Sequence, residues 1–248
     1  MEAWFISDIH IKTLEERNSE ILLRFLHSLR LKNPQEVHLF LLGDIFDLWV
    51  GGHSVFVKKF QPIVDAVAAL KNAGAKITYI EGNHDVHVHA FWTKKLGIEV
   101  LVEAHYYELN GLVVRVEHGD LINLEDKTYL RYRSIIRNPF VQPLGHIIPG
   151  FFWEEAGKIA AKKSRARSQT YRVQNEQKLV QMIRNHAHRV YEERPFDVII
   201  SGHMHVIDEY EFQVGVRKSR SINLGSWYSP EVKALKMTGP SFEWVTLK

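Results

Sequence analysis

The sequence predicts an α/β fold with a largely parallel sheet. Short apolar runs with strand character recur along the chain, and nearly all of them end at a cluster of polar residues. Two stretches with apolar residues at three- and four-residue spacing, 18–32 and 55–73, lie between the first three runs and predict helices. Strands that alternate with helices are typical of layered α/β proteins. The 248 residues suit one large domain, or one domain with an insertion.

The predicted strands deliver polar side chains to one edge of the sheet. In chain order the runs are "AWFISDIH", "EVHLFLLGDIFD", "KITYIEGNHD", "LVVRVEHGD" and "DVIISGHMH". They end, respectively, on Asp8 and His10; on Asp44 and Asp47; on Asn83, His84 and Asp85; on His118 and Asp120; and on His203 and His205. Ligands of such sheets bind beyond the carboxyl ends of the strands. We therefore expect the five clusters to form one site.

Residues 125–190 interrupt this series of strand-like runs. The segment has helical character, few strand-like runs, and a position between the fourth and fifth polar clusters. We expect it to form a helical cap inserted over the site, with residues 1–124 and 191–248 as the core.

Composition narrows the chemistry of the site. The chain has no cysteine, which excludes disulfides and thiolate metal sites, so its 14 histidines are the main resource for metal binding. No window of about 18 uninterrupted apolar residues is present, which argues against a membrane span. The opening "MEAWFISDIH" carries an early acid and runs into a strand pattern, unlike a signal peptide. We expect a cytoplasmic enzyme.

Together the five clusters resemble the calcineurin-like metallophosphoesterase superfamily, from Asp8 to His205. The resemblance implies a four-layer α/β/β/α sandwich with two divalent metals. It implies one ion held by Asp8, His10, Asp44 and His205, and a second held by Asp44, Asn83, His118 and His203, with Asp44 as the bridge. Carboxylates and imidazoles without sulfur suit manganese, iron or zinc, and we expect manganese. Two ions about 3.5–4 Å apart activate water and clamp the oxygens at phosphorus.

His84 resembles the imidazole that faces the phosphoryl group in this superfamily and protonates a leaving oxygen. We expect Asp85 to orient it by accepting its other N–H. Four further polar residues match no ligand position and are predicted to be loop residues or supporting acids: His87, His89, Asp47 and Asp120.

A closer resemblance, outside the metal motifs, is to the UDP-2,3-diacylglucosamine pyrophosphatases of lipid A synthesis. It rests on "GDIFDLWVGG", on a D-x-x-Y-x-x-x-R match that begins at Asp126, on "IAAKKSRARS" and on "INLGSW". It implies cleavage of UDP-2,3-diacylglucosamine to UMP and 2,3-diacylglucosamine 1-phosphate. The implied substrate-binding residues are Asn83, Tyr129, Arg133, Arg165 and Ser168.

One residue departs from that pattern. Many of those pyrophosphatases carry arginine where this chain has His84. A diphosphate leaving group is a weak base that scarcely needs a proton, whereas an alkoxide gains far more from an acid. A metallophosphoesterase acting on another monoester or diester (a nucleotide, phospholipid or phosphoprotein) is therefore the alternative. A non-catalytic scaffold is the third hypothesis, and the presence of all seven implied ligands argues against it.

The composition of the expected cap indicates which partners the protein binds. Residues 139–153 are apolar but broken by proline and glycine, and would be either an anchor at a membrane interface or the core of the cap. Residues 157–172 contain six basic residues and no acid, and would be either a solvated helix face or a patch for diphosphate and anionic headgroups. Phe and Trp are not interleaved with these charges, so no nucleic acid is expected. The expected partners are an acylated sugar nucleotide and the anionic inner face of the inner membrane.

Overall fold

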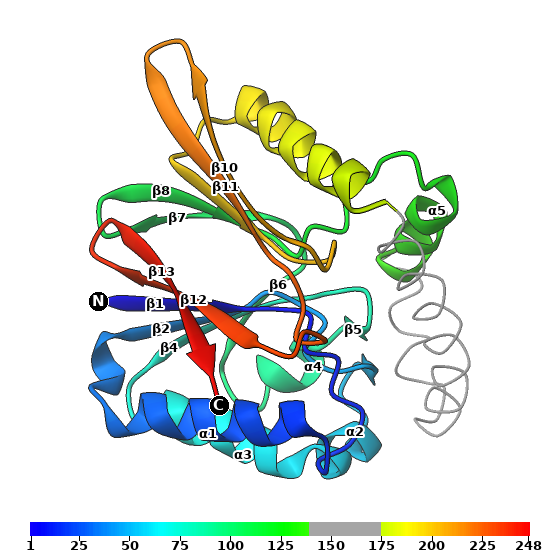
Figure 1. Cartoon of the computed structure of the whole chain (residues 1–248). Coiled ribbons are helices and arrows are strands. Elements are labelled where there is room, and N and C mark those ends of the chain that lie inside the picture. The colour runs from blue at the N-terminus through cyan, green and yellow to red at the C-terminus, as the bar shows by residue number, and fades with distance from the viewer. Residues whose placement is uncertain (139–174) are drawn as a thin grey trace.

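Two β-sheets face each other at the centre of the molecule, in a computed structural model that describes residues 1–138 and 175–248 (Figure 1). The six-stranded sheet has the order β13 (Ser241–Leu247), β12 (Val232–Thr238), β1 (Glu2–Ile6), β2 (Val37–Leu41), β4 (Lys76–Ile80) and β6 (Glu99–Leu101). The five-stranded sheet has the order β10 (Ile207–Val214), β11 (Arg217–Leu224), β9 (Val198–Ser201), β8 (Leu112–Val116) and β7 (His105–Leu109).

All five predicted strand runs form strands, but they are divided between the two sheets. β1, β2 and β4 lie in the six-stranded sheet, whereas β8 and β9 lie in the five-stranded one. The neighbours β1–β2–β4–β6 and β8–β9–β11 are parallel, and antiparallel strands complete both sheets. The sheets are thus mixed. Periodicity identifies a strand, but it does not identify its partner.

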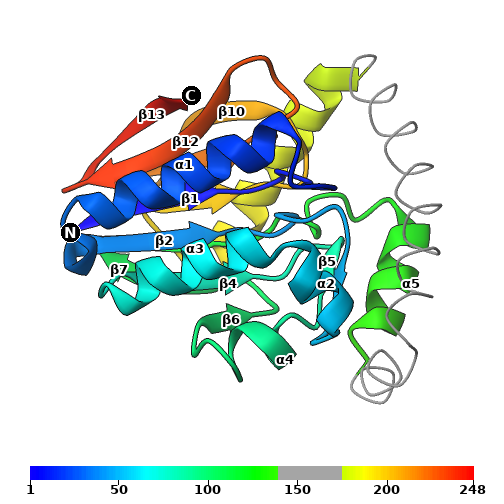
Figure 2. The same ribbon diagram turned by 90° about the horizontal axis from the view of Figure 1, so that it is seen from below.

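Helices cover the outer faces of both sheets and complete an α/β sandwich. α1 (Arg17–Leu31) and α3 (Gln61–Asn72) lie on the six-stranded sheet, and a helix over 175–193 lies on the five-stranded sheet (Figures 1 and 2). The predicted helix over 55–73 is two helices, because α2 (Ser54–Lys59) ends before Phe60. Pro62, near the start of α3, cannot donate a helical hydrogen bond, and a proline is tolerated only in the first turn.

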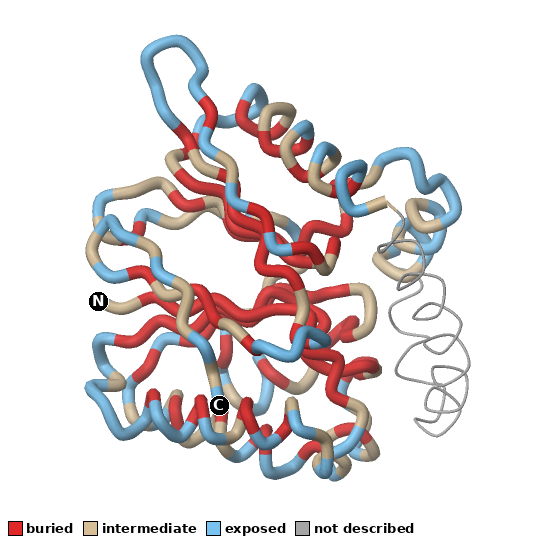
Figure 3. Tube along the Cα trace, viewed as in Figure 1, coloured by how far each residue is buried: buried red, intermediate tan, exposed pale blue. Residues whose placement is uncertain are grey.

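Buried apolar clusters of the described residues fill the spaces between the layers (Figure 3). One joins α1 and α3 to the six-stranded sheet, and another joins the helix over 175–193 to the five-stranded sheet. The middle cluster lies between the sheets and includes Phe5 and Phe40, whose rings stack at 4.8 Å. These clusters hold the strand ends in fixed positions.

Small elements gather near the carboxyl ends of the central strands. They are a two-stranded sheet, formed by β3 (Trp49–Val50) and β5 (Asp85–Val86), and two short helices, α4 (His89–Trp92) and α5 (Lys127–Ile136). Elsewhere, a 3₁₀ turn (Pro34–Glu36) precedes β2. Asp126 caps α5, because its side chain accepts a 2.9 Å hydrogen bond from the Tyr129 amide.

The expected cap is described only at its two ends. Its first part is α5, and its last part is the helix over 175–193, which packs on the five-stranded sheet through Ala187 and Val190. The boundary expected at residue 190 therefore lies inside that helix. Arg165, Ser168 and the segments 139–153 and 157–172 lie outside the described residues. Of the described helices, none has the length and apolar character needed to cross a bilayer.

Candidate metal centre

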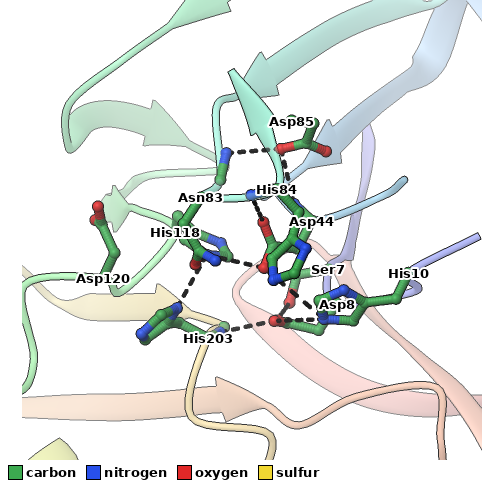
Figure 4. Close-up of polar contacts among 12 residues, drawn as sticks. Ser7, Asp8, His10, Asp44, Asn83, His84, Asp85, His118, Asp120 and His203 are labelled. Carbon is green, nitrogen blue, oxygen red and sulfur yellow. Dashed lines mark hydrogen bonds and ion pairs between the residues drawn. The ribbon is translucent and has the colours of Figure 1, made fainter. Parts of the chain in front are cut away.

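The seven residues that the sequence implies as ligands converge where loops from both sheets meet, and all of them except His205 are labelled in Figure 4. The loops after β1 and β2 are tied together by backbone hydrogen bonds from Asp8 N to Gly43 O, at 3.1 Å, and from His10 N to Asp44 O, at 3.0 Å. In the other sheet, Gly202 N donates to His118 O at 2.8 Å. The parallel pairing of neighbouring strands continues into these loops and brings the polar side chains together.

Asp8, His10 and His205 form the first cluster. Asp8 Oδ1 lies 3.1 Å from His205 Nε2, and His10 Nε2 lies 3.2 Å from the same nitrogen. The ligand atoms of these three residues all lie within 4.8 Å of one another. This spacing suits three donors around one ion.

The second cluster contains Asn83, His118 and His203. His118 Nε2 lies 3.2 Å from His203 Nδ1 and 3.3 Å from Asn83 Oδ1. Asp44 Oδ2 stands between the clusters, 3.8 Å from His10 Nε2 and 3.7 Å from His118 Nε2. One carboxylate oxygen thus faces both donor sets, as a bridging ligand requires.

Each buried carboxylate uses one oxygen to hold the protein and directs the other into the centre. Asp8 Oδ2 accepts from Ser7 Oγ at 2.5 Å and from the His203 amide at 2.8 Å. Asp8 Oδ1 is buried and faces two imidazole nitrogens, His205 Nε2 at 3.1 Å and His10 Nε2 at 3.8 Å. Burying a carboxylate is costly, and a cation held between this oxygen and the two imidazoles would relieve the cost. With the sulfur-free donor set, this oxygen shows that the residues fit a hard or borderline divalent metal.

The imidazoles differ in protonation. Burial lowers the pKa of His10 to about 3, and burial with the nearby charge of His118 lowers the pKa of His203 to about 4. Burial also disfavours charge on His118, but the carboxylates of Asp44 and Asp8 outweigh it and raise its pKa to about 9. Its Nδ1–H donates to the Leu42 carbonyl at 2.8 Å, so Nε2 is the nitrogen that must lose its proton to bind a metal.

The backbone is strained at the same residues. Among the described residues, seven non-glycine positions have positive φ, and five of them carry expected ligands: Asp8 (51°), His10 (53°), Asp44 (53°), His203 (65°) and His205 (57°). Such conformations cost on the order of 1–3 kcal/mol each and gather at functional sites. The ligands are therefore held by the surrounding fold against a local preference.

The expected contact between Asp85 and the His84 ring does not form, and that prediction is wrong. His84 Nδ1–H donates instead to the Asp47 carbonyl, at 2.8 Å. The two oxygens of Asp85 accept from four donors at 2.6–3.0 Å: the amides of Asp44, Ile45 and Gly82, and the Tyr79 hydroxyl. Asp85 is fully buried, and a buried carboxylate needs such donors. It clamps the Asp44 loop to the Gly82 loop.

Tyr129 and Arg133, both predicted to bind substrate, lie beside the second cluster and meet at Asp120. Asp120 Oδ2 accepts from Tyr129 Oη at 2.9 Å and from Arg133 Nε at 2.7 Å, and it lies 3.6 Å from an Arg137 nitrogen. The Tyr129 ring lies 5.7 Å from the His203 ring. Arg137 was not predicted, although its four-residue spacing from Arg133 could have indicated it. One acid thus docks α5 against the centre.

A cavity of about 280 Å³ opens next to His118, on the α5 side of the centre. Its wall includes apolar residues such as Leu121 and Val190, together with charged residues of both signs, such as Arg133, Arg189 and Glu193. This side of the centre therefore offers a mixed surface of apolar, basic and acidic groups.

Several known proteins are similar to this chain. The sequence model of the calcineurin-like phosphoesterase family matches residues 1–207. Relatives named UDP-2,3-diacylglucosamine hydrolase occur in Ectopseudomonas mendocina (29% identical; 96% of this chain and 94% of the relative) and in Aliivibrio fischeri (27%; 92% of both). A third, in Klebsiella pneumoniae, is 28% identical and covers 99% of this chain and 98% of its own. Among solved structures, Vps29 from Cryptosporidium parvum matches with a TM-score of 0.45 and 10% identity, over 99% of this chain and 95% of its own.

Proposed function

The chain belongs to the calcineurin-like phosphoesterase family and is thereby a metal-dependent hydrolase, and we propose that it cleaves UDP-2,3-diacylglucosamine to UMP and 2,3-diacylglucosamine 1-phosphate. The observation that carries this proposal is the position of Tyr129 and Arg133 beside the candidate metal centre. Relatives named for this substrate match more than nine-tenths of the chain, α5 included. The reaction would place the protein in lipid A synthesis.

The proposed cofactor is a pair of divalent ions, manganese first, with iron or zinc as alternatives. Asp8, His10, His205 and Asp44 would hold one ion, and Asp44, Asn83, His118 and His203 the other. Two ions bound there would activate a water and neutralise charge on the phosphoryl oxygens. The chain contributes the fixed placement of these donors, since the strained loops and buried carboxylates orient them in advance.

His84 is the proposed acid at the reacting phosphorus. With its Nδ1–H donated to the Asp47 carbonyl, its Nε2 is free to serve the substrate. The ring stands at 90° to His10, with centroids 4.9 Å apart, so it borders the first cluster. In an in-line attack on the α-phosphorus, an imidazolium at His84, which carries a proton on Nε2 as well as on Nδ1, would donate that proton or a hydrogen bond and so stabilise charge that develops on oxygen.

The acylated sugar would lie on the α5 side. Tyr129 and Arg133 lie there against Asp120, and the cavity beside His118 adds a wall of apolar and charged residues. Arg165 is proposed to bind the anionic phosphate oxygens of the substrate, and Ser168 to hydrogen-bond the sugar or its amide linkages. We propose residues 125–190 as the cap and 1–124 with 191–248 as the core, with the cap resting on the anionic inner face of the inner membrane.

A substrate comparison tests this proposal. The manganese-loaded protein should hydrolyse UDP-2,3-diacylglucosamine with a Michaelis constant orders of magnitude below that for the deacylated analogue. The reason is that each acyl CH₂ removed from water contributes about 0.8 kcal/mol. Asp44→Asn serves as the control, because it keeps the shape of the bridge and removes its charge. Equal rates for both substrates at low concentration, or no cleavage of the lipid form, would refute the lipid assignment.

His84 itself favours a second candidate, a phosphodiester or phosphomonoester with a poor leaving group. Such a substrate needs an acid, and Nε2 of His84 is placed to supply one. The same assay distinguishes the candidates when alkyl phosphodiesters and monoesters are added. A higher kcat/KM for one of these than for the lipid nucleotide would favour the second candidate.

A further inference from the structure

A tyrosine outside every predicted motif borders the first cluster of the candidate metal centre. The Tyr228 ring lies nearly parallel to the His10 ring, with centroids 5.4 Å apart and an interplanar angle of 13°. It also lies 5.8 Å from the His205 ring. Although it touches two expected metal ligands, Tyr228 is 40% exposed. An aromatic surface is therefore open to solvent at the rim of the centre.

The segment that carries Tyr228 is fixed to the metal loop. Trp227 N donates to the Asp8 carbonyl at 3.1 Å, and the Trp227 side chain is buried in the core beneath α1. Asn18 Nδ2 donates both to the Ile9 carbonyl, at 3.3 Å, and to the Trp227 carbonyl, at 3.1 Å. The ring thus has a position set by the same backbone that positions the first ligands, which lowers the entropy cost of binding against it.

Two tyrosines flank the centre on different sides. Tyr129 lies against His203 of the second cluster, whereas Tyr228 lies against His10 and His205 of the first. The bridging oxygen of Asp44 stands between the clusters. A phosphorus held over Asp44 would therefore have one substituent directed to α5 and the other directed to Tyr228.

We infer that Tyr228 is the platform on which the base of a nucleotide substrate stacks. The inference rests on the proposed function. It assigns a binding site to the uridine half of that substrate, for which the sequence predicted no residue. A planar base suits a fixed, exposed aromatic face, since offset stacking needs no matching hydrogen bonds. The sugar half is left for the α5 side, where Tyr129 and Arg133 lie and the cavity has a mixed wall of apolar and charged residues.

Calorimetric titration tests the inference without turnover. The manganese-loaded protein is titrated with UMP and with ribose 5-phosphate, which has the same phosphate but lacks the base. Stacking of one base on an aromatic side chain is worth about 1–3 kcal/mol, so UMP should bind roughly 5- to 150-fold more tightly than ribose 5-phosphate. In Tyr228→Ala the two affinities should converge, whereas Tyr228→Phe keeps the ring and should keep the difference.

The outcomes separate this inference from the proposed function. A Tyr228→Ala variant that still prefers UMP to the wild-type extent, or a wild-type protein that binds both ligands equally, would overturn the inference. If hydrolysis of the lipid nucleotide fails while the UMP preference depends on Tyr228, the proposed substrate is wrong and the base platform stands. If the lipid nucleotide is hydrolysed but Tyr228→Ala leaves the preference for UMP over ribose 5-phosphate unchanged, only the role of Tyr228 as a base platform is wrong.

Discussion

Asp44 divides its two carboxylate oxygens between the protein and the candidate metal centre. Oδ1 accepts a 2.8 Å hydrogen bond from the His84 amide, and Oδ2 faces both ligand clusters. Because a backbone donor holds Oδ1, the orientation of the bridge depends on the loop rather than on the identity of residue 84. The side chain of His84 is therefore available for a separate role.

That separation allows His84 to be tested alone. The His84→Ala variant should keep both metals, because its backbone amide still holds Asp44. Its rate of hydrolysis should nevertheless fall. The loss should be about 10²–10⁴-fold for poor leaving groups, as for a missing general acid, and smaller for good ones. Rates are measured on phosphodiesters of graded leaving-group pKa, with metal content by mass spectrometry. His89→Ala, outside the ligand clusters, is the control, and equal losses along the series would mean that His84 donates no proton.

Metal binding should be coupled to proton release from His118. The pKa of His118 is raised to about 9 in the metal-free protein, so at neutral pH its Nε2 carries a proton that a metal must displace. Metal affinity should therefore rise with pH up to about 9, by up to tenfold per unit. Calorimetry at pH 7.5, in buffers of different ionisation enthalpy, should detect about one proton released per chain. Affinity independent of pH between 6.5 and 8.5 would contradict the assignment.

At the scale of the elements, the loops approach one another more closely than side chains allow. A Cβ on Gly202 would lie 2.2 Å from Ser7 Oγ and 2.3 Å from Asp8 Oδ2. A Cβ on Gly82 would lie 2.1 Å from Asp44 Oδ1. The glycines in the G-H-x-H and G-N-H-D motifs thus make room for the oxygens that orient the carboxylates.

Gly202→Ala should accordingly displace Asp8 and weaken the first cluster. We expect loss of about 1–3 kcal/mol of folding stability, as for an overpacked core, and at least one ion lost from the loaded protein. Gly52→Ala is a matched control, because its added Cβ would meet Ala90 at an ordinary 3.5 Å. Thermal unfolding and metal analysis of both variants provide the comparison. A Gly202→Ala variant with wild-type metal content would show that this close approach is dispensable.

The strand ends were predictable, but their connections were not. Each apolar run predicts a strand, and the polar residues that follow it predict the site. Asp85 was misassigned because its neighbours in sequence, Asn83 and His84, suggest a catalytic partner. Its actual donors, Ile45 and Tyr79 among them, become visible only when two loops are brought together in space. Tyr228 was missed as a contact residue for the same reason.

At the scale of the whole molecule, a polar network links the two sheets. His38 of β2 is buried and forms a 2.9 Å hydrogen bond with Thr78 Oγ1, which in turn donates to Glu99 at 2.8 Å. Tyr107 of the opposite sheet donates to the same carboxylate at 2.6 Å. Burial, with a smaller effect of the charge on Lys76, lowers the pKa of His38 to about 3.

This network predicts acid sensitivity. Between pH 6.5 and about 3 the unfolded chain binds a proton at His38 that the folded chain does not, so stability falls as the pH falls through this window. His38→Gln should reduce the slope by up to about 1.4 kcal/mol per pH unit. Urea unfolding of the metal-free protein at pH 7, 6 and 5 measures this slope, with exposed His27→Gln as the control. An unchanged slope in His38→Gln would contradict the prediction.

The most direct test of the proposed reaction follows the oxygen of the attacking water. The manganese-loaded protein is supplied with UDP-2,3-diacylglucosamine in ¹⁸O-labelled water, and both phosphate products are examined by mass spectrometry. Attack at the α-phosphorus predicts one labelled oxygen in UMP and none in 2,3-diacylglucosamine 1-phosphate, with no products from Asp44→Asn. Label in the sugar phosphate, or an intact substrate, would contradict the proposed function.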